Sequence, residues 1–250
     1  MPTFRDNFPP KPQFAENSIS SQAGKVFLVT GCSSGVGKEL AKILYSHNAK
    51  VYITARSTKK AEAAIADIKA AHPESRGELI YLHLDLNDLS SVKQSADEFL
   101  RLENRLDVLW NNAGVMLSPT GTKTKQGYEE QLGVNCLATF LFTQLLTPLL
   151  ISTAKTAAPG SYAKLHQNDG IMVVINMMVY PPINGAYTEL FAGLSPEVTL
   201  EKSGAWIQPW GRFSSQRSDL VEGSKSKAEG GTGIAEKFWS WSEEQVKPFI

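Results

Sequence analysis

Cysteine is scarce in this chain, and neither sign of charge is in excess. Its 250 residues include only two cysteines, Cys32 and Cys136, and equal numbers of acidic and basic residues give a formal net charge of zero. Two separate thiols provide no disulfide framework, which fits a reducing compartment. A neutral chain has no general attraction for nucleic acid or for an anionic membrane surface. These absences argue against a disulfide scaffold and against a nucleic-acid-binding domain.

Long hydrophobic runs are also missing. The longest apolar run covers residues 140–151 and contains Gln144 and Pro148. A bilayer span needs about 20 apolar residues, so this run predicts a buried helix rather than a membrane span. Residues 1–23 are polar and rich in proline, as expected for a loose arm without a secretory signal. We therefore expect a cytoplasmic protein.

The sequence also lacks clusters of residues at the spacing that metal sites use. The four histidines are scattered, and none has a cysteine or carboxylate partner at the spacing that metal sites use. The sequence therefore predicts no metal site.

Short β-branched runs alternate with amphipathic helical stretches from residue 25 onward. Strands are expected at 25–30, 49–55, 79–84 and 106–111, and helices at 35–46, 57–72, 89–104 and 128–151. This alternation predicts an α/β fold with a Rossmann-type, doubly wound parallel sheet covered by helices on both faces. Later elements are expected as strands at 171–176 and 204–210, helices at 183–194 and 234–246, and a flexible connection at 217–233.

A glycine-rich turn, TGCSSGVG, links the first expected strand to the first helix. Gly31 permits the tight turn, Gly35 lets the backbone approach a pyrophosphate, and Gly37 lets the helix pack closely on the strand. The free N–H groups at the positive end of that helix then face the anion. The predicted phosphate-binding residues are Gly31, Ser33, Ser34, Gly35, Val36 and Gly37.

Arg56 stands at the end of the second expected strand, with Lys59 and Lys60 close by. A carboxylate at this position would bind the ribose hydroxyls of NAD and repel a 2′-phosphate. A guanidinium can instead bind the 2′-phosphate of NADP bidentately. The alternative is a solvated arginine at a helix entrance. The position favours NADP over NAD.

Two further motifs follow in order, Asp85-Leu86 after the third expected strand and NNAG at residues 111–114. Together with the glycine turn they resemble the short-chain dehydrogenase/reductase pattern, over residues 24–155. The resemblance implies that Asp85 contacts the adenine, and that the other cofactor-binding residues flank bound NADP. These other residues are Leu86, Asn112, Ala113 and Gly114.

The same resemblance places Asn135 at the family's helix asparagine, which helps to hold a water in the proton relay. It implies hydride transfer between NADP and a small-molecule carbonyl or alcohol, and it leaves a homo-oligomer open. The tail at residues 230–249 resembles the C-termini of fungal, retinol-dehydrogenase-like members. Such members often belong to secondary metabolism.

The family's catalytic pair is missing. Hydride transfer to a carbonyl needs a proton donor, which in this family is a tyrosine acidified by a lysine four residues later. None of the seven tyrosines has a lysine at that position. Tyr180 follows an expected strand end and could be a relocated acid, but no lysine accompanies it.

Two alignments of this chain with the family pattern explain why the tyrosine–lysine pair is missing. In the first, residues 171–178 replace the fifth strand and residues 213–217 form a degenerate YxxxK motif. In the second, residues 162–176 are the end of the catalytic helix and the sixth strand, so the serine loop and the front of that helix are deleted. We favour the second alignment because it accounts for every later segment in order, and it makes Phe213 an ordinary surface-segment residue.

The predicted organisation is an arm (1–23), one domain (24–216) and a flexible segment with a terminal helix (217–250). Within the domain, residues 24–155 form an intact cofactor half and residues 156–216 an incomplete catalytic half, so the fold is truncated toward its C-terminus. The hypotheses are an NADP-dependent oxidoreductase, and an NADP-binding pseudoenzyme or inactive truncated family member.

Overall fold

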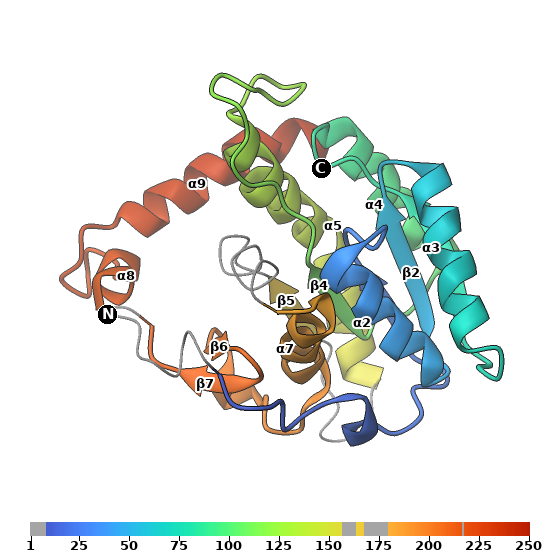
Figure 1. Cartoon of the computed structure of the whole chain (residues 1–250). Coiled ribbons are helices and arrows are strands. Elements are labelled where there is room, and N and C mark those ends of the chain that lie inside the picture. Colours follow the sequence, from blue (N-terminus) through green and yellow to red (C-terminus); the bar gives the residue numbers. More distant parts are fainter. Residues whose placement is uncertain (1–8, 157–163, 168–179, 217) are drawn as a thin grey trace.

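The computed structural model describes residues 9–156, 164–167, 180–216 and 218–250. Its centre is a parallel sheet with the strand order β3-β2-β1-β4-β5 (Figure 1). The strands are β1 (Val26–Val29), β2 (Lys50–Ala55), β3 (Glu78–His83), β4 (Val108–Asn111) and β5 (Lys164–Gln167). The chain builds β1 to β3 outward and then returns to β4 on the other side of β1. This order confirms the doubly wound sheet expected from the sequence.

Helices cover both faces of the sheet, because each buries an apolar stripe against it. One face carries α2 (Gly35–Ser46), α3 (Thr58–Ala71) and α7 (Pro182–Leu194), and the other carries α4 (Leu89–Leu102) and α5 (Thr139–Thr156). Helix starts follow local chemistry: the Ser57 side chain caps α3 and the Asp88 side chain caps α4.

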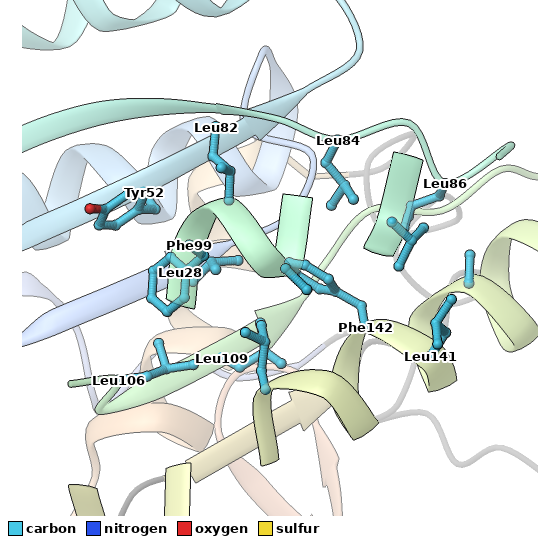
Figure 2. Close-up of a cluster of buried hydrophobic side chains, with 14 of the residues drawn as sticks. Leu28, Tyr52, Leu82, Leu84, Leu86, Phe99, Leu106, Leu109, Leu141 and Phe142 are labelled. Carbon is cyan, nitrogen blue, oxygen red and sulfur yellow. The ribbon is translucent and has the colours of Figure 1, made fainter. Parts of the chain in front are cut away.

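Figure 2 shows the core between the sheet and the α4–α5 face. Leu28 and Leu109 project from adjacent strands toward Phe99 and Phe142, and all four are fully buried. The Tyr52 ring meets Phe99 edge to face, with centroids 4.8 Å apart. This packing fixes α4 and α5 relative to the ends of the strands.

On the opposite face, Trp110 of β4 is fully buried and meets Phe27 edge to face at 5.3 Å. Its indole Nε1 donates a hydrogen bond of 2.9 Å to the backbone oxygen of Glu189 in α7. A Cβ on Gly193 would lie only 2.2 Å from Trp110 Cζ2. Helix α7 therefore docks on β4 at a distance that only glycine allows.

The longest helix begins as a π-helix, η2 (Leu132–Ala138), and continues as α5. By length and composition alone, Leu132–Thr156 could cross a membrane. Leu141, Phe142 and Leu146 are fully buried in the core with α4. This burial is the arrangement expected of a helix that packs on a sheet.

After α7 the described chain forms shorter elements. They are η3 (Leu200–Lys202), β6 (Trp206–Gln208), β7 (Arg212–Ser214), α8 (Ser218–Ser224), α9 (Ile234–Val246) and η4 (Lys247–Phe249). Helix α9, red in Figure 1, returns toward the α4–α5 face, where Val246 is fully buried. The terminal helix therefore contributes to the core of the cofactor half.

Several expectations for the second half are wrong. Residues 164–167, expected at the end of a catalytic helix, form β5, because they pair in parallel with the open edge of β4. The short strand expected at 204–210 is present as β6 at 206–208, but it pairs antiparallel with β7 in a separate sheet. Phe213 meets Phe191 at 5.6 Å instead of lying in a surface segment. The strand expected at 171–176 lies outside the described residues.

Two segments expected to be loose have structure. Phe14 meets the ring of Phe191 edge to face at 5.8 Å, and the backbone N–H of Gln22 donates to the carbonyl of His47 at 2.6 Å. The connection expected to be flexible at 217–233 contains α8. The arm makes these contacts with distant parts of the chain, whereas α8 lies against α9, the next helix along the chain.

Candidate cofactor site

A cavity of about 430 Å³ lies at the carboxyl ends of β1, β2 and β4. Open α/β sheets place ligands at this edge, where the strand order reverses. The cavity brings together Gly31, Ser33, Ser34, Gly35, Val36, Arg56, Asp85, Leu86, Asn112, Ala113 and Gly114. Two more of the predicted residues, Gly37 and Asn135, are not among its lining residues.

The glycine turn is held in a conformation that favours glycine. Gly31 has φ +75° and Gly35 has φ +64°, both in the left-handed region. A Cβ on Gly37 would lie 2.5 Å from Asn112 Nδ2 and 2.7 Å from the carbonyl oxygen of Gly31. Gly37 therefore lets the start of α2 pack against the turn and the loop after β4.

A polar network joins that loop to the turn. Asn112 Nδ2 donates a hydrogen bond of 2.7 Å to the carbonyl of Thr30, and the Ala113 N–H donates one of 2.9 Å to Thr30 Oγ1. The Gly31 N–H donates to Thr54 Oγ1 at 3.3 Å. The ends of β1, β2 and β4 are thus tied together at the cavity floor.

The start of α2 fits a phosphate group. Ser34, its N-cap residue, has no side-chain capping hydrogen bond in the described structure, and the first turn contains no acidic residue. The first N–H groups of a helix lack intrahelical partners and carry partial positive charge. Because Ser33, Ser34 and Gly35 line the cavity, this end of α2 can bind the pyrophosphate of a dinucleotide.

The cationic end of the cavity lies at the carboxyl end of β2. Arg56, Ser57 and Lys60 line it, whereas Lys59 is not among the lining residues. Arg56 and Lys60 are exposed, and neither forms a salt bridge within the described residues. Their positive charges can meet a phosphate on the ribose of the cofactor.

Asp85 lies on another wall of the cavity. Its Oδ1 accepts a hydrogen bond of 3.0 Å from the N–H of Asn87, and its own N–H donates to Ser91 Oγ at 3.2 Å. These bonds fix the turn between β3 and α4, and one carboxylate oxygen has no hydrogen bond among the described residues. The segment can therefore present an acceptor to the amino group of an adenine.

Asn135 does not line the cavity, and its side chain forms hydrogen bonds with the backbone of a residue that does. Its Oδ1 accepts from the N–H of Val115, and its Nδ2 donates to the carbonyl of Val115, both at 2.8 Å. The π-helix η2 sets this side chain opposite the loop after β4, and such helices occur often at functional sites. Each amide atom keeps further hydrogen-bonding capacity.

The described cavity walls contain no tyrosine, and the lysine among them is Lys60, at the phosphate end. Tyr180 is half-buried with its ring 5.1 Å from Trp210, and it does not line the cavity. Burial raises the pKa of the Cys32 thiol far above its usual range, so this residue of the glycine turn is no nucleophile at neutral pH.

Sequence reasoning missed several lining residues, which are Thr54, Ala55, Ser57, Leu84, Asn87, Val115, Met116, Glu130 and Val134. Most of them directly adjoin a motif, so extending each motif by two residues would have found them. Glu130 and Val134 lie four residues apart, on one face at the start of the long helix. Val134 directly precedes the predicted residue Asn135, whereas nothing in the sequence indicated that Glu130 lies at the cavity.

Comparison with known proteins gives the same assignment. A family model described as short chain dehydrogenase matches residues 25–199. A short-chain dehydrogenase/reductase of Phomopsis amygdali is 42% identical, with 97% of this chain and 96% of that protein covered. Another from Neocamarosporium betae is 40% identical, with 97% and 92% covered.

Among solved structures, an uncharacterised protein of Mycobacterium paratuberculosis has the same fold, with a TM-score of 0.62. It is 21% identical, and the match covers 94% of this chain and 97% of that one. The family match and the two fungal relatives carry the assignment beyond the fold alone. The chain belongs to the short-chain dehydrogenase/reductase family of oxidoreductases.

Proposed function

We propose that this chain binds NADP(H) in the cavity at the carboxyl edge of the sheet. The pyrophosphate is assigned to the start of α2, the 2′-phosphate to Arg56 and Lys60, and the adenine to the wall containing Asp85. The observation that carries the proposal is the cationic pair at the end of β2, where an NAD-binding site has a carboxylate. When bound, the nicotinamide ring donates or accepts a hydride.

Titration of the purified protein with NADPH and NADH, followed by cofactor fluorescence, tests this preference. Replacing Arg56 with alanine is expected to weaken NADPH binding roughly 10-fold or more, because one charge-assisted phosphate contact is lost. The affinity for NADH is expected to stay the same. Arg101→Ala, on the exposed side of α4, is the matched control. Equal weakening of both cofactors by Arg56→Ala would contradict the assignment.

The second part of the proposal is that the chain lacks the family's usual proton donor. No tyrosine is followed by a lysine four residues later, and the described cavity walls contain no tyrosine. The alignment with the Phomopsis amygdali protein runs over 319 positions, more than this chain's 250 residues, which supports an internal deletion. We assign the chain as an NADP-binding family member without the tyrosine-dependent carbonyl reduction.

Catalysis is the second candidate, because the family as a whole acts on small-molecule carbonyls and alcohols and the sequence match spans nearly the whole chain. Incubation with NADPH and a panel of aldehydes, ketones and quinones separates the two. Tight NADPH binding without cofactor oxidation is expected. Oxidation at rates of about 1 s⁻¹ or more, in the range of ordinary enzymes, would instead establish an active oxidoreductase.

A further inference from the structure

The loop between β4 and the long helix contains a small hairpin, residues 122–130. The Thr124 N–H donates to the carbonyl of Tyr128 at 2.9 Å, and the Glu130 N–H donates to the carbonyl of Thr122 at 3.2 Å. An isolated antiparallel bridge pairs Lys123 with Glu129. The hairpin ends at Glu130, a residue that lines the cavity.

The tip of this hairpin is fastened to the residues between β3 and α4. Asp88 Oδ2 accepts from Lys125 Nζ at 2.8 Å, and Asp88 Oδ1 accepts from Gln126 Nε2 at 2.9 Å. Two further bonds involve the backbone: the Lys125 N–H donates to the carbonyl of Asn87 at 3.0 Å, and the Leu89 N–H donates to Gln126 Oε1 at 3.2 Å. Four bonds therefore converge on residues 87–89.

Asp88 is suited to hold this junction at neutral pH. The Lys125 ammonium, followed by the Gln126 amide and the Ser90 N–H, keeps the pKa of Asp88 below its usual range, despite partial burial. Its side chain is 15% exposed, whereas that of Lys125 is 65% exposed. The carboxylate also caps α4 by accepting from the Ser90 N–H at 3.0 Å. One side chain thus serves the helix start and the hairpin tip.

The junction lies between two walls of the cofactor cavity. Leu86 and Asn87 line it on the β3 side, and Glu130 and Val134 line it on the side of the long helix. Fastening the hairpin to residues 87–89 fixes the separation of these walls before a ligand arrives. A binding site that is ordered in advance loses less conformational entropy when it is filled.

We propose that Asp88 is a positioning residue for the adenine half of the cofactor, acting through the hairpin and without contact to the ligand. This inference rests on the proposed NADP(H) site. It predicts that loosening the junction weakens binding of the adenine half, in the full cofactor and in an isolated adenine fragment, by the same factor.

The test uses Asp88→Ser, because serine is also a favoured N-cap residue but is too short to reach Lys125 and Gln126. In the free protein, hydrogen exchange of the Lys125 amide is expected to accelerate about 10-fold, since its bond to Asn87 opens more often. The dissociation constants of NADPH and of adenosine 2′,5′-bisphosphate are both expected to rise about 5- to 20-fold. The melting temperature is expected to change little.

Asp97→Ser is the matched control. Asp97 forms an exposed ion pair of 2.5 Å with Lys93 on α4 and does not line the cofactor cavity. Lys125→Met removes the same junction bond from the exposed partner, and Lys125→Arg is expected to restore binding. Both variants change an exposed side chain, so folding is not at risk.

Three outcomes overturn the inference. The first is unchanged exchange of the Lys125 amide in Asp88→Ser, which shows that the side chain does not hold the hairpin. The second is accelerated exchange with unchanged dissociation constants, which shows that the junction does not serve the ligand. The third is weaker binding of NADPH with unchanged binding of the adenine fragment. Failure of the unaltered protein to bind NADPH would instead reject the proposed function itself, and the inference with it.

Discussion

The cofactor half, residues 24–155, and the second half, here residues 180–250, are built differently. In the first, a parallel sheet is buried between two apolar layers, and strands such as β1 are buried throughout. In the second, α8 has no buried residue, and α9 buries only Ser242 and Val246. Phe238 and Trp239 of α9 are about half exposed, at 46% and 57%.

The difference shows how the second half is held. Helix α7 is bound to β4 through Trp110, and α9 is anchored to the other face of the sheet through Val246. Between these anchors the elements pack mainly through aromatic pairs, such as Phe191 with Phe213. The second half therefore depends on the first for its stability, and through α7 and Val246 it completes both apolar layers of the first.

The largest expected effect comes from removing a ring from each region. Phe99→Ala empties a fully buried site beside Tyr52, and we expect it to cost about 3–5 kcal/mol of unfolding free energy. Phe213→Ala removes a half-buried ring and should cost about 1–2 kcal/mol. Urea denaturation measures both values. Equal costs would show that the two regions are equally well packed.

The next effect concerns glycine. Gly37→Ala places a Cβ against the Asn112 amide and the Gly31 carbonyl, so we expect a loss of about 1–3 kcal/mol and a clear weakening of NADPH binding. The added Cβ of Gly223→Ala in α8 meets no atom of the described residues within 4 Å, and the variant should be more stable by about 0.4–1 kcal/mol. Thermal melts of both variants, with NADPH titrations, check the contrast. Unchanged stability and unchanged NADPH binding in Gly37→Ala would contradict this contrast between the two glycines.

A smaller effect measures the link between the halves. The Tyr128 hydroxyl donates a hydrogen bond of 2.9 Å to Gln245 Oε1 in α9, and its ring meets Trp241 edge to face. A double-mutant cycle with Tyr128→Phe and Gln245→Ala should give a coupling of about 0.5–1.5 kcal/mol. A coupling of zero would mean that this hydrogen bond does not stabilise the contact between α9 and the cofactor half.

The smallest effect is a pH dependence at Asp88. Its pKa is lowered in the folded protein, mainly by Lys125, so its contribution is present in full above the unfolded pKa of about 3.9. That contribution is lost as the pH falls through the folded pKa. The stability difference between the unaltered protein and Asp88→Ser should therefore shrink between about pH 5 and pH 2. A difference that stays constant over this range would contradict the ion pair.

Much of the first half was predictable because its signals are local. The expected helix at 35–46 has the observed bounds of α2, and Ser57 caps α3 as its sequence indicated. Residues of the glycine turn and of the NNAG segment line one cavity together with Arg56 and Asp85. They meet there because parallel strands end at a common edge of the sheet. The chain after residue 156 resisted prediction because β5 and the β6–β7 pair depend on partners, and periodicity does not reveal a partner.

The sequence by itself determined the alternation of strands and helices, the glycine positions of the turn and the basic residues at the end of β2. Each of these depends on residues close together along the chain, where periodicity, capping and backbone freedom act. Only the tertiary structure decided that residues 164–167 complete the sheet and that Asp88 fastens the hairpin at residues 122–130. These contacts join segments far apart in sequence, so their geometry exists only after the layers have packed.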